Sequence, residues 1–179
     1  MVETSNVTPL PGSGDQRFRE PPHTFEAEQA LLGAILVNNF AYNRVSDFLK
    51  PEHFADPLHG RIFEAAARLR HRLGLTPQTR VVLFAGKLVA GKQPRALLTA
   101  YLATPRTGTA LVFVGEGDEK AALQAQAAGA PDVHFLPFAN QSEMPSRYLL
   151  ADLFVLPSRG HYETWGLAVN EAMHLGVPA

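Results

Sequence analysis

The chain has 179 residues, of which 46% are hydrophobic and 18% are charged, so it can bury one core or two small ones. Its formal net charge of −1 leaves no electrostatic footprint for nucleic acid or for an anionic membrane surface. The absence of cysteine excludes disulfides and thiolate metal sites, and the seven histidines show none of the spacings typical of a metal site, so we expect no metal.

Residues 1–22 carry Ser, Thr, Gly and Pro with almost no apolar periodicity, so we predict a disordered tail there. This start lacks the basic and apolar regions of a signal peptide. No run elsewhere in the chain approaches the length of a transmembrane helix, and the lack of cysteine fits a reducing compartment. We therefore expect a cytoplasmic protein.

Residues 23–72 predict a small all-α segment. Thr24 can cap a first helix, because two glutamates follow in its first turns and an apolar stripe with helical spacing comes next. Further helices are predicted over 43–49 and 59–72, with prolines in the connection between them. Composition alone would leave this segment as a helical bundle without chemistry.

The same segment resembles a known family. The stretches P-P-H-T-F-E-A-E-Q-A-L-L-G-A-I-L and L-K-P-E-H-F-A-D-P-L-H-G-R-I-F-E-A are similar to the start of the N-terminal domain of DnaB-type replicative helicases, over about residues 21–69. In that family the domain is helical, packs into a collar around the hexamer and helps to recruit primase. The resemblance covers about the first half of that domain, and nothing in the sequence resembles the helicase motor.

From Arg80 onward, short apolar runs alternate with segments of helical period. The predicted strands cover 81–85, 111–114, 133–136 and 153–156, and the predicted helices cover 95–102, 119–128, 142–151 and 164–175. This alternation favours a parallel, doubly wound sheet, in which ligands bind outside the carboxyl ends of the strands. Because Lys87, Gly115 and Glu163 follow strand ends, we expect them to converge on one crevice.

The loop and helix start within residues 157–178 form the clearest candidate site. Glu163 and Glu171 are separated by seven residues and bracket the first turns of the helix, and Gly166 lets a ligand approach the backbone. The unpaired N–H groups and the positive dipole end at such a helix start suit a phosphate. A purely structural interpretation stays open, in which one glutamate stabilises the helix dipole and the other is solvated.

The stretch E-T-W-G-L-A-V-N-E-A-M-H-L-G-V-P resembles the signature of the retaining, nucleotide-sugar-dependent glycosyltransferases of GT-B fold, family four in the usual classification. The resemblance implies that Glu163 contacts the donor sugar and that Glu171 holds the ribose of the nucleotide. The backbone around Gly166 and Leu167 would face the diphosphate.

Four earlier blocks resemble the same family in the same order, so that the resemblance spans about residues 73–179. They read V-V-L-F-A-G-K-L, L-V-F-V-G-E-G, V-H-F-L-P-F-A-N-Q-S-E-M-P and Y-L-L-A-D-L-F-V-L-P-S. The resemblance implies an α/β fold with an incomplete Rossmann-like parallel sheet, half of a GT-B fold, preceded by the all-α segment.

Residues 86–93 read G-K-L-V-A-G-K-Q, which is close to an ATP-binding phosphate loop but places Gln93 where Ser or Thr would hold magnesium. The glycosyltransferase resemblance explains this segment better. In that family two basic side chains here neutralise the nucleotide diphosphate, and their positions fall on Lys87 and Lys92. Two solvated lysines in a loop are the alternative.

The resemblance implies retaining transfer of a sugar from a nucleotide diphosphate, without a cofactor or an obligatory metal. No catalytic residue can be assigned, because the histidine commonly found near the anomeric carbon belongs to the other domain of that family. We expect residues 73–179 to be a truncated nucleotide-sugar-binding domain that is not competent alone. The nucleotide, the sugar and the acceptor stay open.

Two further hypotheses remain. The helical segment could be a helicase-type module for oligomerisation or primase interaction in DNA replication, without direct nucleic-acid binding and with self-association through this segment or through an exposed sheet edge. Alternatively, the chain is a chimera of two fragments with no evolved function of its own, because two unrelated resemblances meet near Arg70.

Overall fold

The computed structural model describes residues 24–37, 41, 44–45, 47–159 and 166–179. The tail predicted over 1–22 lies outside these residues. Within the helix predicted over 43–49, Arg44 and Val45 are helical, and the Val45 carbonyl accepts from the amides of Phe48 and Leu49 in a closing turn. No helix in the described part of the chain combines the length and the apolar character needed to cross a bilayer.

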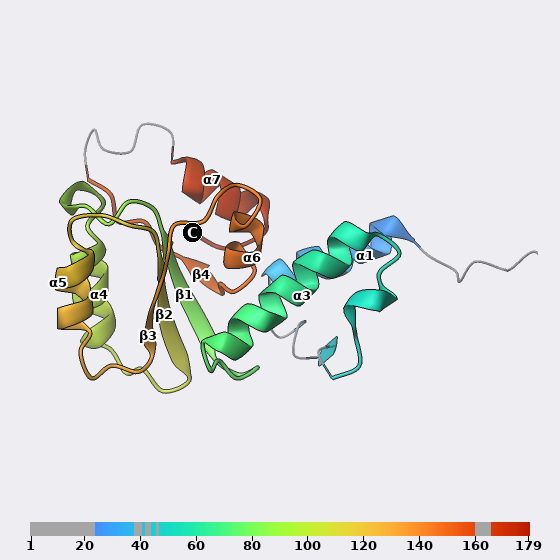
Figure 1. Cartoon of the computed structure of the whole chain (residues 1–179), viewed down its shortest axis with the longest axis horizontal. Helices are drawn as coiled ribbons and strands as arrows, with labels where there is room; N and C mark the ends of the chain where they lie inside the picture. Colours follow the sequence, from blue (N-terminus) through green and yellow to red (C-terminus); the bar gives the residue numbers. More distant parts are fainter. Residues whose placement is uncertain (1–23, 38–40, 42–43, 46, 160–165) are drawn as a thin grey trace, which may run out of the picture.

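An all-α segment precedes a unit of alternating strands and helices, as Figure 1 shows. The elements in chain order are α1 (Phe25–Val37), the 3-10 turn η1 (Pro51–His53), α3 (Pro57–Arg72), β1 (Arg80–Ala85), the 3-10 turn η2 (Ala90–Lys92), α4 (Pro94–Leu102), β2 (Thr109–Val114), α5 (Lys120–Gln126), β3 (Val133–Leu136), α6 (Met144–Tyr148), β4 (Leu153–Phe154) and α7 (Leu167–His174). Several elements are shorter than predicted: α5 does not fill 119–128, α6 does not fill 142–151, and β4 does not reach residue 156.

The four strands form one parallel sheet in the order β3-β2-β1-β4. In this register Ala85 lies opposite Val114, and Val114 lies opposite Leu136. The carboxyl ends of β1, β2 and β3 are therefore level, and the loops that follow them leave the sheet at one edge. The predicted α/β class with a parallel Rossmann-like sheet is confirmed.

Successive side chains of each strand point to opposite faces of the sheet, and helices cover both faces. On one face Leu83 shares a buried core with Tyr148 of α6 and Ala172 of α7. On the other face Phe84 packs with residues of α4 and α5, including Leu98 and Leu123. The strands are thus buried on both sides, as a parallel sheet requires.

The helical segment has its own small core, and this core reaches the sheet unit. Phe54 and Phe63 pack with their ring centroids 5.5 Å apart, next to Leu32 and Ile35 of α1. Leu149, which directly follows α6, belongs to the same cluster. Since apolar burial is the main source of packing energy, this shared cluster holds the helical segment against α6.

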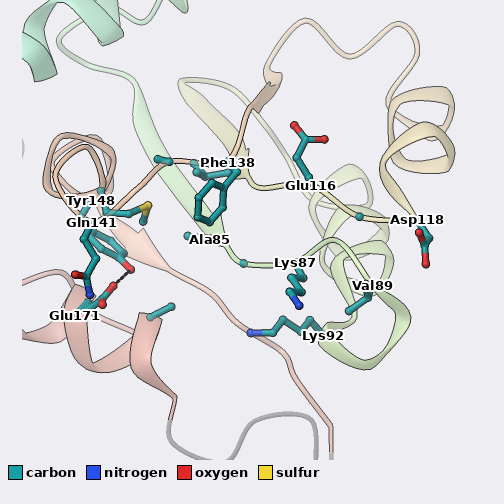
Figure 2. Close-up of a pocket in the computed structure, with 16 residues that line it drawn as sticks. Ala85, Lys87, Val89, Lys92, Glu116, Asp118, Phe138, Gln141, Tyr148 and Glu171 are labelled. Carbon is teal, nitrogen blue, oxygen red and sulfur yellow. Dashed lines mark hydrogen bonds between the residues drawn. The ribbon is translucent and has the colours of Figure 1, made fainter.

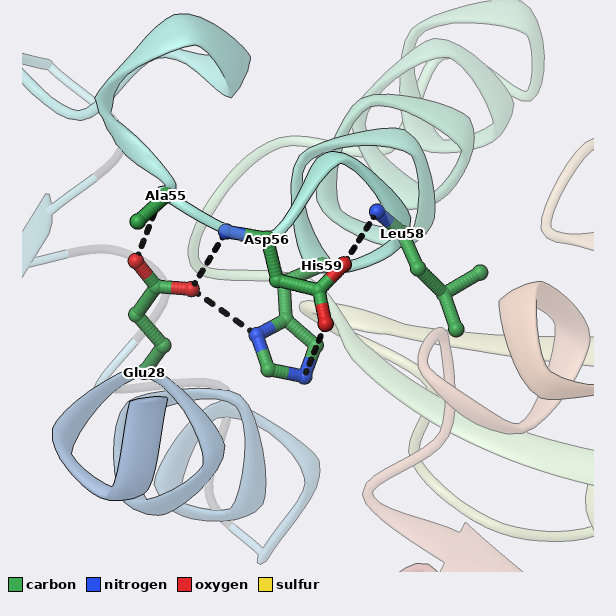
Figure 3. Close-up of polar contacts among 5 residues, drawn as sticks. All are labelled: Glu28, Ala55, Asp56, Leu58 and His59. Carbon is green, nitrogen blue, oxygen red and sulfur yellow. Dashed lines mark hydrogen bonds and ion pairs between the residues drawn. The ribbon is translucent and has the colours of Figure 1, made fainter. Parts of the chain in front are cut away.

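A carboxylate fastens α1 to the start of α3, as Figure 3 shows. Glu28 Oε1 accepts from the Ala55 amide at 2.5 Å, and Oε2 accepts from the Asp56 amide at 3.2 Å and from His59 Nδ1 at 2.9 Å. The hydrogen bond from His59 is the largest of the effects that hold the pKa of Glu28 below its usual value. Asp56 in turn caps α3 by accepting from the Leu58 amide at 2.7 Å.

Candidate functional site

A cavity of about 700 Å³ opens at the carboxyl edge of the sheet. The ends of β1 and β2 and the loops after β1, β2 and β3 form its floor and one wall, and α6 with the first turns of α7 forms the other wall (Figure 2). This is the position at which parallel α/β sheets bind ligands. Its volume lies within the range of small-molecule sites.

Close backbone contact between two loops makes the floor of the cavity. A Cβ atom on Gly115 would lie 2.0 Å from the carbonyl oxygen of Gly86, and one on Gly117 would lie 2.3 Å from that of Leu88. The loops are tied together by the Leu88 amide, which donates to the Glu116 carbonyl oxygen at 2.9 Å. Glycine is therefore required here, because any side chain would push the two loops apart.

Lys87 and Lys92 both line the cavity from the loop that follows β1, and Figure 2 shows their side chains at the same end of it. The Lys92 ammonium lies 3.4 Å from the position that a Cβ on Gly86 would take. Gln93, with φ 52° and ψ 43°, then turns the chain into α4. Two cationic groups thus face one part of the cavity.

Glu171 and Tyr148 meet at the opposite end. The Tyr148 hydroxyl donates to Glu171 Oε2 at 2.8 Å, across the gap between α6 and α7. Tyr148 is 1% exposed, and its burial raises the pKa of its phenol, with a further rise from the hydrogen bond and charge of Glu171. The hydroxyl therefore stays protonated and serves as a fixed donor to the carboxylate.

Phe138 adds an aromatic wall from the loop after β3. Its side chain is 72% exposed although it lines the cavity, next to Gln141 and Met144. Figure 2 shows the ring above Ala85, between the lysines and Glu171. An uncovered ring beside hydrogen-bonding groups offers a stacking surface for a planar ligand.

Carboxylates form the remaining rim. Glu116 and Asp118 follow β2 and line the cavity, and Glu116 pairs with Lys120 at 2.7 Å. Among the described residues, no three histidine, aspartate or glutamate side chains come close enough together to hold a metal ion. The cavity is thus basic near the β1 loop and supplies hydrogen-bond acceptors elsewhere.

Three of the predicted site residues, Lys87, Lys92 and Glu171, lie around this one cavity. Glu163 lies outside the described residues, so its contact with a sugar stays a prediction. Gly166, in a left-handed conformation with φ 55°, and the 66% exposed Leu167 begin α7 but do not line the cavity. Their approach to a diphosphate likewise stays a prediction.

Sequence reasoning missed Tyr148 and Phe138 as cavity residues. Tyr148 stands in the block Y-L-L-A-D-L-F-V-L-P-S and Phe138 in the block V-H-F-L-P-F-A-N, so both lie in stretches that carry the resemblance. The position of Phe138 in the loop that follows a predicted strand was a usable signal, because strand-end loops line the ligand crevice in this architecture.

Two family models match the chain. The model described as "Glycosyl transferases group 1" matches residues 66–179, and the model described as "DnaB-like helicase N terminal domain" matches residues 20–76. The two matches overlap at the end of α3, where the helical segment meets the sheet unit.

The curated relatives are likewise of two kinds. A "Replicative DNA helicase DnaB" of Rickettsia conorii is 49% identical over 76 residues, which is 42% of this chain and 14% of that protein. A "D-inositol 3-phosphate glycosyltransferase" of Salinispora arenicola is 33% identical over 136 residues, which is 68% of this chain and 30% of that protein. The chain therefore spans less than a third of the length of either relative.

Two solved structures are similar to part of the chain. Anabaena Alr3699/HepE, in complex with UDP-glucose, is 25% identical, with a TM-score of 0.54 over 63% of this chain and 32% of that one. WaaG, a glycosyltransferase involved in lipopolysaccharide biosynthesis, is 24% identical, with a TM-score of 0.53 over 64% of this chain and 31% of that one. At that identity the likeness to WaaG shows a common fold and no more.

Proposed function

Because the chain belongs to the glycosyl transferases of group 1, we propose that its crevice binds a nucleoside diphosphate sugar, the donor for retaining glycosyl transfer. The observation that carries the proposal is the meeting of Lys87, Lys92 and Glu171 around one cavity of about 700 Å³. The UDP-glucose complex of the similar Alr3699/HepE supports a nucleotide sugar as the ligand class.

The positive charges in the cavity suggest where the diphosphate part of the ligand would bind. The diphosphate would lie beside Lys87 and Lys92, where two ammonium groups offset its negative charge. These same groups would stabilise the charge that grows on the diphosphate as it leaves the sugar. The loop backbone that passes over Gly86 and Gly115 lets the phosphates come close.

The nucleoside would extend from the lysines toward α6 and α7. Glu171 would accept hydrogen bonds from the ribose hydroxyls, because one of its oxygens is engaged by Tyr148 and the other remains available to a ligand. Phe138 would stack on the base. Base–aromatic stacking contributes about 1–3 kcal/mol per base in nucleic-acid complexes, which sets the scale expected here.

Donor binding and turnover are separate parts of the proposal. We expect this chain to bind the donor without catalysing transfer alone, because no residue of the cavity is assigned to the anomeric carbon. The predicted contact between Glu163 and the donor sugar belongs to the same proposal.

Calorimetric titration with UDP, GDP and ADP, and with their glucose conjugates, tests the proposal. We expect saturable binding of one nucleotide family, weakened about tenfold or more in Glu171→Ala, because a hydrogen bond to a charged group contributes about 1.5–3 kcal/mol. Glu26→Ala, an exposed carboxylate in the first turn of α1, is the matched control and should bind normally. Equal affinities in the wild type and Glu171→Ala would contradict the ribose assignment.

A second candidate function rests on the helical segment. Residues 20–76 match the DnaB-like model, and among the residues of this segment that the structure describes, Phe25, Phe48 and Leu58 are large apolar side chains that are exposed. We propose as the alternative that this surface associates with a second copy of the chain. Light scattering across a concentration series should then reveal oligomers that Phe48→Ser disperses, and a monomer at every concentration would rule this candidate out.

A folded chain that neither binds a nucleotide nor associates would favour the third hypothesis, a chimera without an evolved function.

A further inference from the structure

The core of the sheet unit holds Tyr148 rigidly. Tyr148 is the last residue of α6, and its ring meets Phe154 of β4 at 62° with the centroids 5.8 Å apart. Its side chain is almost completely buried, but the residue still lines the edge of the cavity. The phenol ring is therefore fixed by packing, and this fixes the position of the hydroxyl as well.

Glu171 lies between two hollows. It lines the cavity of about 700 Å³ and also a neighbouring one of about 530 Å³, on whose wall Asn170 and His174 lie. A glutamate side chain has several rotatable bonds, so a carboxylate in this position could turn toward either hollow. The 2.8 Å hydrogen bond from Tyr148 to Oε2 selects one orientation.

We propose that Tyr148 is a positioning residue, which orients the Glu171 carboxylate to recognise the ribose diol of a bound nucleoside diphosphate. This inference rests on the proposed function. With one oxygen held by the phenol, the other is presented in a fixed direction, and orientation of this kind lowers the entropy that binding must otherwise remove. Tyr148 itself need not touch the ligand.

A hydroxyl that is buried and hydrogen-bonded but has no role in ligand binding would make the same contacts. The test must therefore measure how well the protein recognises the ribose diol. We would take whichever of UDP, GDP and ADP binds best and compare it with its 2′,3′-dideoxy counterpart. The ratio of the two dissociation constants measures how strongly the protein recognises the ribose hydroxyls. In Tyr148→Phe we expect this ratio to fall about three- to tenfold, as the loss of one orienting hydrogen bond implies, with little change for the dideoxy ligand.

The chain contains a matched control. The hydroxyl of Tyr101 also donates to a carboxylate, Asp132 Oδ2, at 2.9 Å, and Tyr101 is also buried. Asp132 directly precedes β3, so this pair lies at the amino ends of the strands, whereas the cavity lies at their carboxyl ends. Tyr101→Phe removes the same atom from the same kind of bond and should leave the diol ratio unchanged.

Tyr148→Phe keeps the ring, and water can replace the lost donor because Glu171 is only half-buried, so we expect the variant to fold. Melting curves verify this before titration. In a Glu171→Gln background the same substitution should have a smaller effect on the ratio, because Tyr148 acts through Glu171.

An unchanged ratio in folded Tyr148→Phe, or an equal fall in Tyr101→Phe, would overturn the inference while the proposed function stands. A wild-type chain that binds none of the three nucleotides would overturn both.

Discussion

Replacing Gly115 by alanine tests the loop contact on which the cavity depends. Gly115 follows β2 with φ 144°, and an added Cβ would lie 2.0 Å from the Gly86 carbonyl oxygen. Hydrogen bonds of the sheet hold both glycines in place. The Gly115 amide donates to the Leu136 carbonyl oxygen at 3.1 Å, and the Gly86 amide donates to the Val114 carbonyl oxygen at 3.0 Å. Neither loop can retreat without breaking a ladder hydrogen bond.

The expected cost combines two effects. A non-glycine residue in a sparsely populated backbone conformation costs about 1–3 kcal/mol, and overpacking against a fixed neighbour costs about 1–3 kcal/mol more. We therefore expect Gly115→Ala to lower the free energy of unfolding by about 3 kcal/mol or more. For a chain of this size, that corresponds to a fall in Tm of roughly 6–12 °C.

Urea denaturation followed by circular dichroism measures this change, and two glycines supply controls. Gly129 also has positive φ, 85°, but a Cβ there would meet nothing within 4 Å, so Gly129→Ala should show only the backbone cost of about 1 kcal/mol. Gly33 lies inside α1 with nothing within 4 Å, and Gly33→Ala should stabilise by up to about 1 kcal/mol. If Gly115→Ala cost no more than Gly129→Ala, the loops could not be in the described contact.

The remaining predictions concern the ligand and the helical segment. Lys92→Met should weaken nucleotide binding about tenfold and make the affinity less sensitive to salt. Arg95→Met, on the exposed start of α4, removes a positive charge outside the cavity and should do neither. If titrations at two salt concentrations showed equal effects for the two variants, Lys92 would not contact the diphosphate. Phe138→Ala should weaken binding by about 1–3 kcal/mol and leave Tm nearly unchanged because its ring is already exposed, so a large fall in Tm with intact binding would contradict its stacking role. Glu28 has a folded-state pKa below its ordinary value of 4.5, so its stabilising effect is fully present above that pH and is lost as the pH falls through the folded pKa. The free energy of unfolding, measured by circular dichroism, should therefore fall less steeply with decreasing pH in Glu28→Gln than in the wild type. This variant also alters the contacts with His59 and the loop amides in Figure 3. Identical pH profiles of the two proteins would contradict the lowered pKa.

The sheet could be predicted from local sequence because its strands are buried on both faces and therefore form continuous apolar runs. The rule that ligands bind at the carboxyl ends of parallel strands placed Lys87, Gly115 and Glu163 at one predicted crevice, and of these Lys87 lines the cavity. Neither inference needs knowledge of which strands are neighbours.

Contacts between distant residues could not be predicted in this way. The Tyr148–Glu171 bond joins residues 23 positions apart and depends on how α6 packs beside α7. The burial of Leu149 against the helical segment likewise depends on a contact between parts of the chain that match different families. The predicted helix over 142–151 was too long because Leu150 and Ala151 leave α6 in a turn that leads to β4.

Hydrogen exchange with and without a nucleotide tests the central claim most directly, because it locates the binding site as well as detecting binding. With UDP, GDP or ADP in excess, we predict slower exchange in the loop after β1 (residues 86–92), the loop after β3 (residues 137–143) and the first turns of α7 (residues 167–171). Exchange in α1 and α3 should change little. Protection confined to the helical segment, or none anywhere with any of the three nucleotides, would contradict a donor site in this crevice.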